Sequence, residues 1–163
     1  MVRTWFTSDL HLGHTNILKF QPNRRYRNLE EHNIGVIREI NELVNPNDTL
    51  WIPGDVAFGK GNLKYVKEIN AKYKRLVLGN HDTYNVVDYI SAGFSKVFGM
   101  VTYKEFILTH APLHEQQLNT RYKYNIHGHM HNESIPDNRY VNVNWDMSEP
   151  KSLEHIREKI YGI

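Results

Sequence analysis

Five short segments of the sequence carry side chains that could bind metal ions. Each one follows a stretch that the sequence predicts to be a β-strand, and open α/β sheets bind their ligands where strands end. Within the first segment, Asp9 and His11 point the same way because side chains on an extended chain alternate with a period of two. The five segments are Asp9-Leu10-His11, Gly54-Asp55, Gly79-Asn80-His81-Asp82, His110 and Gly128-His129-Met130-His131.

The chemistry of these segments is that of a metal site without thiolates, because the 163 residues include no cysteine. Seven candidate ligands are too many for one four-coordinate ion and suit two. A mixture of imidazole and oxygen ligands favours Mn, Fe, Co, Ni or Zn over Mg or Ca, and we expect manganese first among them. The candidates are Asp9, His11, Asp55, Asn80, His110, His129 and His131.

Two divalent ions side by side point to reactions at phosphorus. At a spacing of about 3.5–4 Å they clamp the attacking and leaving oxygens of an in-line displacement and lower the pKa of a bound water so that it attacks as hydroxide. They also neutralise the negative charge that builds on the phosphoryl oxygens. A histidine that is not a ligand suits protonation of the leaving oxygen, and His81 is the candidate.

The elements that must position these segments alternate between strand and helix in the first half of the chain and are mostly strands in the second. We therefore expect two sheets with helices on their outer faces. Asn28 and Ser152 are expected to cap helices, the first with an apolar face of Ile34, Ile37, Ile40 and Val44. Strands are expected at 2–8, 49–52, 75–78, 95–103, 105–109, 125–127 and 139–143, further helices at 63–69 and 86–91, and irregular chain at 15–27.

Composition is that of an ordinary globular protein. The chain is 40% hydrophobic and 23% charged, and its formal net charge of +2 does not by itself argue for nucleic acid as a partner. No apolar run is long enough to span a membrane, and no signal peptide is visible. We expect a cytoplasmic protein with no membrane partner; the oligomeric state is left open.

The five segments, in this order, resemble the calcineurin-like metallophosphoesterases. The stretches 8–17 and 54–59 and the ending Ser152-Leu153-Glu154 are similar to a compact bacterial and phage branch of that family. Phe58 and Gly59 stand where the protein-phosphatase branch has part of a Gly-Asp-x-x-Asp-Arg-Gly motif, so that branch is disfavoured.

The resemblance implies a four-layer αββα sandwich and one domain over residues 1–163, with no cap domain. It also implies that Asp55 bridges the two ions and that His81 faces the scissile group. One ion would be held by Asp9, His11, Asp55 and His131, and the other by Asp55, Asn80, His110 and His129.

The expected reaction is hydrolysis of a phosphate ester, of which a nucleotide is one candidate. Diesters are favoured because a small uncapped domain leaves room on both sides of phosphorus. His14 and Arg24 are candidates to contact the substrate. Their alternatives are a structural hydrogen bond for His14 and a solvated loop for Arg24.

Other histidines and the tryptophans are expected to serve the fold. We expect His127 to be structural and Trp5 and Trp51 to lie in the core. The surface histidines are expected to be His32, His114 and His155.

Two other functions remain open at this stage. The basic loop of Arg24, Arg25, Tyr26 and Arg27 would fit a nuclease or a nucleic-acid-binding module, although such proteins usually show a broader basic face. A non-catalytic scaffold on the same fold is the other alternative. All seven ligand positions and His81 are filled, which favours the enzyme.

Overall fold

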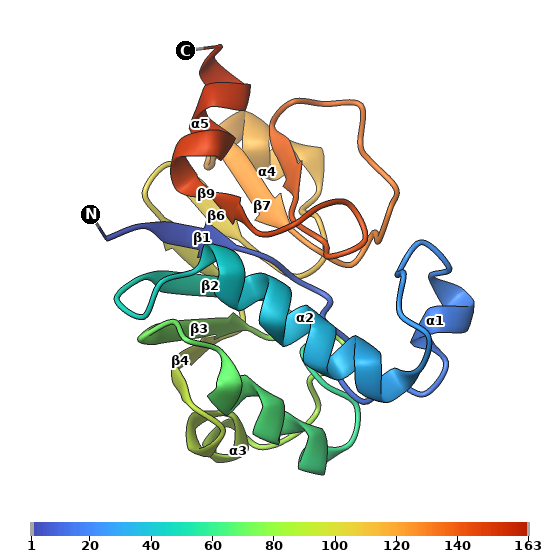
Figure 1. Cartoon of the computed structure of the whole chain (residues 1–163). Helices are drawn as coiled ribbons and strands as arrows, with labels where there is room; N and C mark the ends of the chain where they lie inside the picture. The colour runs from blue at the N-terminus through green and yellow to red at the C-terminus, as the bar shows by residue number, and fades with distance from the viewer. Residues whose placement is uncertain (1, 163) are drawn as a thin grey trace.

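The computed structural model describes residues 2–162 and contains two β-sheets that pack face to face (Figure 1). The first sheet has five strands in the order β4-β3-β2-β1-β9, and the second has four in the order β5-β6-β7-β8. The strands are β1 (Thr4–Phe6), β2 (Thr49–Pro53), β3 (Tyr73–Val77), β4 (Phe94–Phe98), β5 (Val101–Tyr103), β6 (Phe106–Leu108), β7 (Tyr124–His127), β8 (Tyr140–Asn142) and β9 (Lys151–Ser152).

Helices cover the outer faces of the two sheets, as Figure 1 shows for α2. The Asn28 side chain accepts a hydrogen bond from the Glu31 N–H and Ser152 accepts one from the His155 N–H, so both expected caps are present. The helices are α1 (Ile17–Phe20), α2 (Leu29–Leu43), the 3-10 helix η1 (Lys60–Glu68), α3 (Val86–Ser91), α4 (Glu115–Thr120) and α5 (Leu153–Tyr161).

Two apolar clusters hold the layers together and share the strands of the first sheet. One lies between that sheet and α2, η1 and α3, and includes Val36 and Leu50. The other lies between the sheets, where Trp51 and Leu108 are buried, and α5 closes it at one end. On the far face of the second sheet, Asn125 accepts a hydrogen bond from the Leu113 N–H, which anchors the segment that leads into α4. The layers are therefore αββα, and the fold expected from the sequence is confirmed.

Parallel pairing brings the ends of five strands to one edge. β1 pairs with β2 and β2 with β3 in parallel, as does β6 with β7. Loops that follow these strands are tied together by backbone hydrogen bonds, among them Asp9 N–H to Gly54 O at 2.9 Å and Gly128 N–H to His110 O at 2.8 Å. The segments with chemical side chains therefore meet where both sheets end.

The expected strand 95–103 is in fact two strands that belong to different sheets. β4 ends at Phe98, and β5 begins at Val101 after Gly99 and Met100 carry the chain across. The apolar pattern continues through the crossing because both strands contribute to the same interior, so the pattern alone does not show the break.

The buried face of α2 is centred differently from the expected one. Ile34 is 54% exposed, whereas Asn33 is buried and its Oδ1 accepts a hydrogen bond from the Gly13 N–H at 2.8 Å. One residue advances a helix by about 100°, so burial of Asn33 turns Ile34 toward solvent. His32 was expected at the surface, and that prediction was wrong because the side chain is fully buried.

Other differences are smaller. The expected helix 63–69 is the 3-10 helix η1, α4 was not predicted, and α1 lies within the stretch expected to be irregular. His114 and His155 are exposed, and Trp5 and Trp51 are buried, as expected. Across residues 2–162, no helix combines the length and the apolar character that a membrane crossing requires.

Candidate metal centre

The backbone of the predicted ligands lies in an unusual conformation. Five of the seven have positive φ, a region that residues other than glycine rarely adopt, and each costs of order 1–3 kcal/mol there. Among the other non-glycine residues described, Lys104 alone shares it. Such strain persists where the surrounding structure enforces it, and its concentration here marks a functional site. The five are Asp9 (57°), His11 (52°), Asp55 (54°), His129 (67°) and His131 (49°).

Glycines allow the ligand-bearing loops to approach one another. A Cβ on Gly79 would overlap the Asp55 carboxylate, and one on Gly128 would overlap the carboxylate of Asp9. The lack of space for a Cβ explains why Gly stands immediately before the polar side chains of these two segments.

A first group of ligand atoms belongs to Asp9, His11 and His131, whose atoms lie within 4.8 Å of one another. Asp9 Oδ1 and His11 Nε2 are 3.8 Å apart, and both are buried without a hydrogen-bond partner. An unpaired buried carboxylate oxygen is costly, but two atoms that each bind one ion at about 2.0–2.2 Å would have this spacing. The residues present therefore fit a metal ion.

A second group contains Asp9, Asp55 and His110, again within 4.8 Å. His110 Nε2 lies 3.3 Å from Asp55 Oδ2 and 2.9 Å from Asn80 Oδ1. His129 Nδ1 lies 3.1 Å from the same Asn80 oxygen. Side chains from loops that follow strands of both sheets thus converge on the Asn80 side-chain oxygen.

Asp55 lies between the two groups. Its Oδ2 is 3.3 Å from His110 Nε2 in one group and 3.9 Å from His11 Nε2 in the other. Its Oδ1 accepts a hydrogen bond from the His81 N–H at 3.0 Å, which fixes the carboxylate. This is the position that a bridging ligand requires.

Hydrogen bonds orient two of the imidazoles. The His110 Nδ1–H donates to the Pro53 carbonyl at 2.8 Å, so its Nε2 faces the site. His131 Nδ1 lies 2.6 Å from Asp146 Oδ2, which leaves its Nε2 free. Metal-binding histidines are typically held in this way, by a carbonyl or a carboxylate on the second nitrogen.

The two buried carboxylates give the site a negative potential. Burial opposes ionisation of Asp55, but hydrogen bonding to His110 holds the pKa of that carboxyl below its usual value. Burial alone would lower the pKa of His110, yet the Asp55 and Asp9 carboxylates raise it to about 9. A site with this potential attracts cations.

Arg24 is not in the solvated loop that was one expectation for it, since it is 5% exposed. Its guanidinium donates to the carbonyls of Asp9 and Leu10, to both oxygens of Asp146 and to His32 Nε2, at 2.6–3.0 Å. Every N–H of the guanidinium is engaged within the chain, so we replace the expected substrate contact with a positioning role. The contact between Arg24 and His32 Nε2 also explains the burial of His32.

Sequence reasoning missed Asp146. Its side chain is fully buried, and it joins Arg24 to His131. Burial opposes ionisation of Asp146, but His131 and Arg24 hold the pKa of its carboxyl below the usual value. Asp146 follows strand β8, just as the candidate ligands follow other strands. That placement is the sequence signal that could have found it.

Asp82 supports the backbone of the site through hydrogen bonds. Its carboxylate accepts hydrogen bonds from the N–H groups of Asp55, Val56 and Gly79 at 2.7–3.1 Å. Burial raises the pKa of this carboxyl. Asp82 therefore ties the Asp55 loop to the Asn80 loop.

His81 and His14 lie at the rim. The His81 side chain is exposed, and its ring centroid lies 6.0 Å from that of His11 and 4.6 Å from that of Phe58. The half-buried His14 ring stacks on the Phe58 ring, with the ring centroids 4.1 Å apart, and its centroid lies 5.5 Å from that of His11. His127 is buried, and its Nδ1–H donates to the Gly128 carbonyl, which fits the structural role expected for it.

Comparison with known proteins now decides the family. The sequence model described as "Calcineurin-like phosphoesterase" matches residues 2–161. The chain belongs to the calcineurin-like phosphoesterase family. The resemblance drawn from the five segments is thereby confirmed.

Relatives within this family include phage proteins, as the compact phage and bacterial branch implies. The chain is 38% identical over 86 residues to the Gene 66 protein of Mycobacterium phage L5, a match that covers 50% of this chain and 41% of that protein. It is 29% identical over 147 residues to the uncharacterized protein MJ1445 of Methanocaldococcus jannaschii, covering 87% and 77%. The match to the phage L5 protein thus spans less than half of that relative.

A solved structure supports the fold. The protein of unknown function AQ665 from Aquifex aeolicus superposes with a TM-score of 0.74 at 22% identity, covering 97% of this chain and 99% of that one. This likeness establishes the shared architecture.

The variant Asp146→Asn tests the support of His131. It removes the charge that orients this imidazole, and we expect binding of a divalent ion by the group that contains His131 to weaken by about 10–100-fold. Isothermal titration of the metal-free protein with Mn²⁺ measures this. Glu105→Gln, which removes a carboxylate paired with Arg157 instead, is the matched control. Unchanged metal affinity in Asp146→Asn would show that the Asp146 contact does not position a ligand.

Proposed function

We propose that this protein is a phosphoesterase that uses two divalent transition-metal ions to hydrolyse phosphate esters, with diesters preferred. The observation that carries the proposal is the position of Asp55 between two groups of ligand atoms. Family membership supports the same chemistry.

Seven side chains would hold the ions. Asp9, His11, Asp55 and His131 would hold one; Asp55, Asn80, His110 and His129 would hold the other. When bound, two such ions supply positive charge for the phosphoryl oxygens and lower the pKa of a bound water. Imidazole and oxygen donors together favour Mn, Fe, Co, Ni or Zn, and we propose manganese.

His81 is proposed as the general acid. Its backbone N–H is tied to the Asp55 carboxylate while its ring remains exposed. A ring nitrogen of His81 would donate its proton to the leaving ester oxygen as the bond to phosphorus breaks. The His14 ring, which stacks on Phe58, would contact an ester substituent of the substrate.

Arg24 and Asp146 are proposed to position candidate metal ligands without binding the metal themselves. Arg24 donates to the carbonyls of Asp9 and Leu10, and so holds the loop between the first two ligands in its strained conformation. Asp146 orients His131 at the same time.

The preference for diesters rests on the open rim. Asn80, His81 and His129 are exposed, so substituents on both sides of phosphorus can be accommodated. With Mn²⁺ added, we expect kcat/KM for bis(4-nitrophenyl) phosphate to exceed that for 4-nitrophenyl phosphate. A monoester value at least tenfold higher would overturn the preference, and failure to hydrolyse either substrate would overturn the function. A chelator added to the same reaction is the control.

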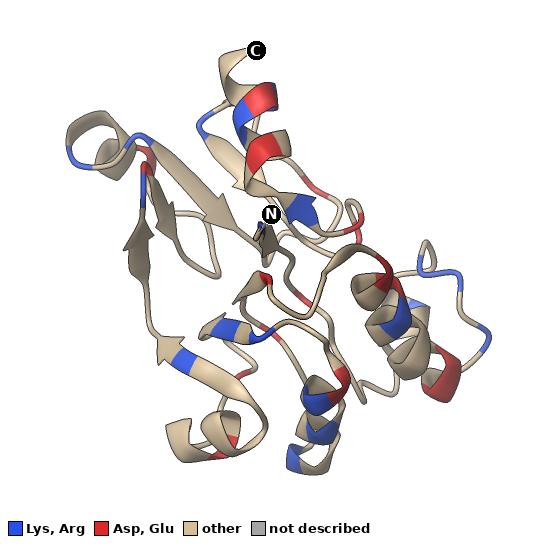
Figure 2. Cartoon of the chain, turned by 60° about the vertical axis from the view of Figure 1, so that its left-hand side comes forward, with Lys and Arg blue, Asp and Glu red and all other residues tan. Residues whose placement is uncertain are grey.

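The alternatives have less support. Figure 2 shows basic and acidic residues interspersed along α2 and α5, which is unlike the extended basic face of most nucleic-acid-binding proteins. Arg24 is committed to internal hydrogen bonds, which removes one charge from the basic loop. A scaffold would not require the strained backbone that five of the ligand positions retain.

A further inference from the structure

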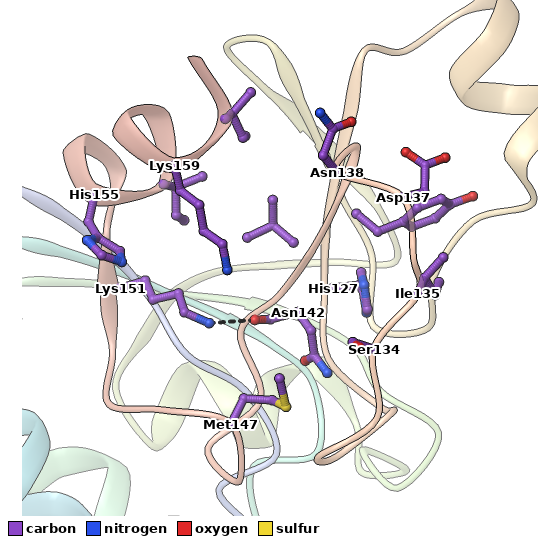
Figure 3. A pocket seen from close by; sticks show the side chains of 14 residues that line it. His127, Ser134, Ile135, Asp137, Asn138, Asn142, Met147, Lys151, His155 and Lys159 are labelled. Carbon is purple, nitrogen blue, oxygen red and sulfur yellow. Dashed lines mark hydrogen bonds between the residues drawn. The ribbon is translucent and has the colours of Figure 1, made fainter. Parts of the chain in front are cut away.

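A cavity whose lining contains no candidate metal ligand lies between the edge strands of the two sheets. It has a volume of about 280 Å³ and is lined by residues of β8, β9 and α5 and of the loop before β8 (Figure 3). β8 ends one sheet and β9 ends the other, and the space between these edges is left open. None of the seven candidate ligands nor His81 lines this cavity.

Two lysines extend into this space. Lys151 comes from β9 and Lys159 from α5, and Figure 3 shows both amines directed toward β8. Lys151 Nζ donates to the Asn142 carbonyl at 2.7 Å. Within the described residues, neither lysine forms an ion pair, and the lining carboxylate of Asp137 is paired with Arg139.

The two ammonium groups disfavour each other. Burial, and then the charge of Lys159, lowers the pKa of Lys151 to about 8, so Lys151 remains largely protonated at pH 7. Lys151 is thus a half-buried cation with the positive charge of the exposed Lys159 nearby, which is costly, and a bound anion would offset that cost. His155 adds a further ring nitrogen at the same end of the cavity (Figure 3).

Part of the lining is an apolar wall. It is formed by side chains from β8, α5 and the flanking loops, and a cavity of this size accommodates a ring or a short aliphatic chain beside a charged group. The apolar lining residues are Ile135, Val141, Met147, Ile156 and Ile160.

We propose that this cavity binds a small organic anion, namely a phosphate, phosphonate or carboxylate attached to an aromatic ring or short aliphatic chain. Lys151 and Lys159 contact the charged group, and the apolar wall contacts the ring or chain. The site is separate from the metal centre and does not depend on the proposed reaction.

Phenylphosphonate is a suitable probe because it carries both parts and has no ester bond to hydrolyse. We expect it to shift the methyl resonances of Val141, Ile156 and Ile160 in a saturable manner in NMR spectra of the Zn²⁺-loaded protein. The shifts should persist in Asp55→Asn, where binding at the metal centre is impaired. Inorganic phosphate should bind this cavity at least tenfold more weakly because it lacks the apolar part.

Lysine variants locate the binding. In the double variant Lys151→Met and Lys159→Met we expect at least tenfold weaker binding, whereas Lys64→Met with Lys67→Met on η1 should leave it unchanged. Lys159→Met alone, at an exposed position, serves if the double variant does not fold. Methyl groups that do not shift, unaltered affinity in the variants at Lys151 and Lys159, or equal affinity for inorganic phosphate would overturn the proposal.

Discussion

Asp55→Asn is expected to lose both bound ions and more than about 10²-fold in kcat/KM, while the fold is kept. The loss should exceed the 10–100-fold typical of residues that only support a ligand, because Asp55 lies between both groups. The substitution removes charge but little volume, and the Asn oxygen can still accept the His81 N–H. Metal content of the purified variant, measured with its activity, tests this.

The fold of the Asp55→Asn variant needs its own control. Asp88→Asn changes a carboxylate that pairs with Lys60 at the surface, and should keep metal and activity. Thermal unfolding of both variants shows whether structure is retained. Two ions bound to Asp55→Asn at wild-type occupancy would contradict a bridging role.

His81→Ala should reduce kcat by about 10²–10⁴-fold for a substrate with an alkyl leaving group, and much less for one that releases nitrophenolate. A stable leaving anion needs little protonation, so loss of a general acid lowers kcat mainly for substrates with poor leaving groups. Because His81 is not needed to complete either proposed ligand set, both metals should remain. The measurement is kcat for two diesters that differ only in leaving-group pKa, together with metal content.

His14→Ala is the matched comparison for His81→Ala. Its ring lies at the same rim, but we propose that it contacts the ester group, so the variant should raise KM with no dependence on the leaving group. An equal loss of kcat on both substrates in His81→Ala would reject proton donation and favour hydrogen bonding to the transition state. Loss of a metal would mean that His81 is a ligand.

The convergence of the candidate ligands could be predicted from the sequence because it follows from local rules. Parallel strands such as β1, β2 and β3 end at one edge, so polar residues placed after each strand must meet there. Asp9, Asp55 and His110 are brought together in this way. The left-handed backbone of Asp9, Asp55 and three of the histidines could not be predicted, because glycine is the usual sign of that conformation and other residues seldom adopt it.

The contacts of the supporting residues could not be predicted because they are long-range. Arg24 and Asp146 are 122 positions apart, and no local pattern relates them. A cluster of three arginines looks solvated, yet Arg24 is buried while Arg25 and Arg27 are exposed. The burial of His32 follows from this pairing.

The predicted bounds and buried faces of elements were wrong where tertiary contacts override local preference. The run 95–103 keeps its apolar character across the step from one sheet to the other, so its division at Gly99 became apparent only with the two sheets in place. Ile34 fits an apolar stripe, but the Asn33 hydrogen bond to Gly13 rotates the buried face of α2 away from it.

The most direct test of a dinuclear centre is titration of the metal-free protein with Mn²⁺, with bound ions per chain and hydrolysis of bis(4-nitrophenyl) phosphate followed together. The seven proposed ligands, with Asp55 shared between two ions, predict that activity rises with the second ion and saturates at two ions per chain. Full activity at one ion per chain, or activity that survives complete removal of metal, would contradict the account.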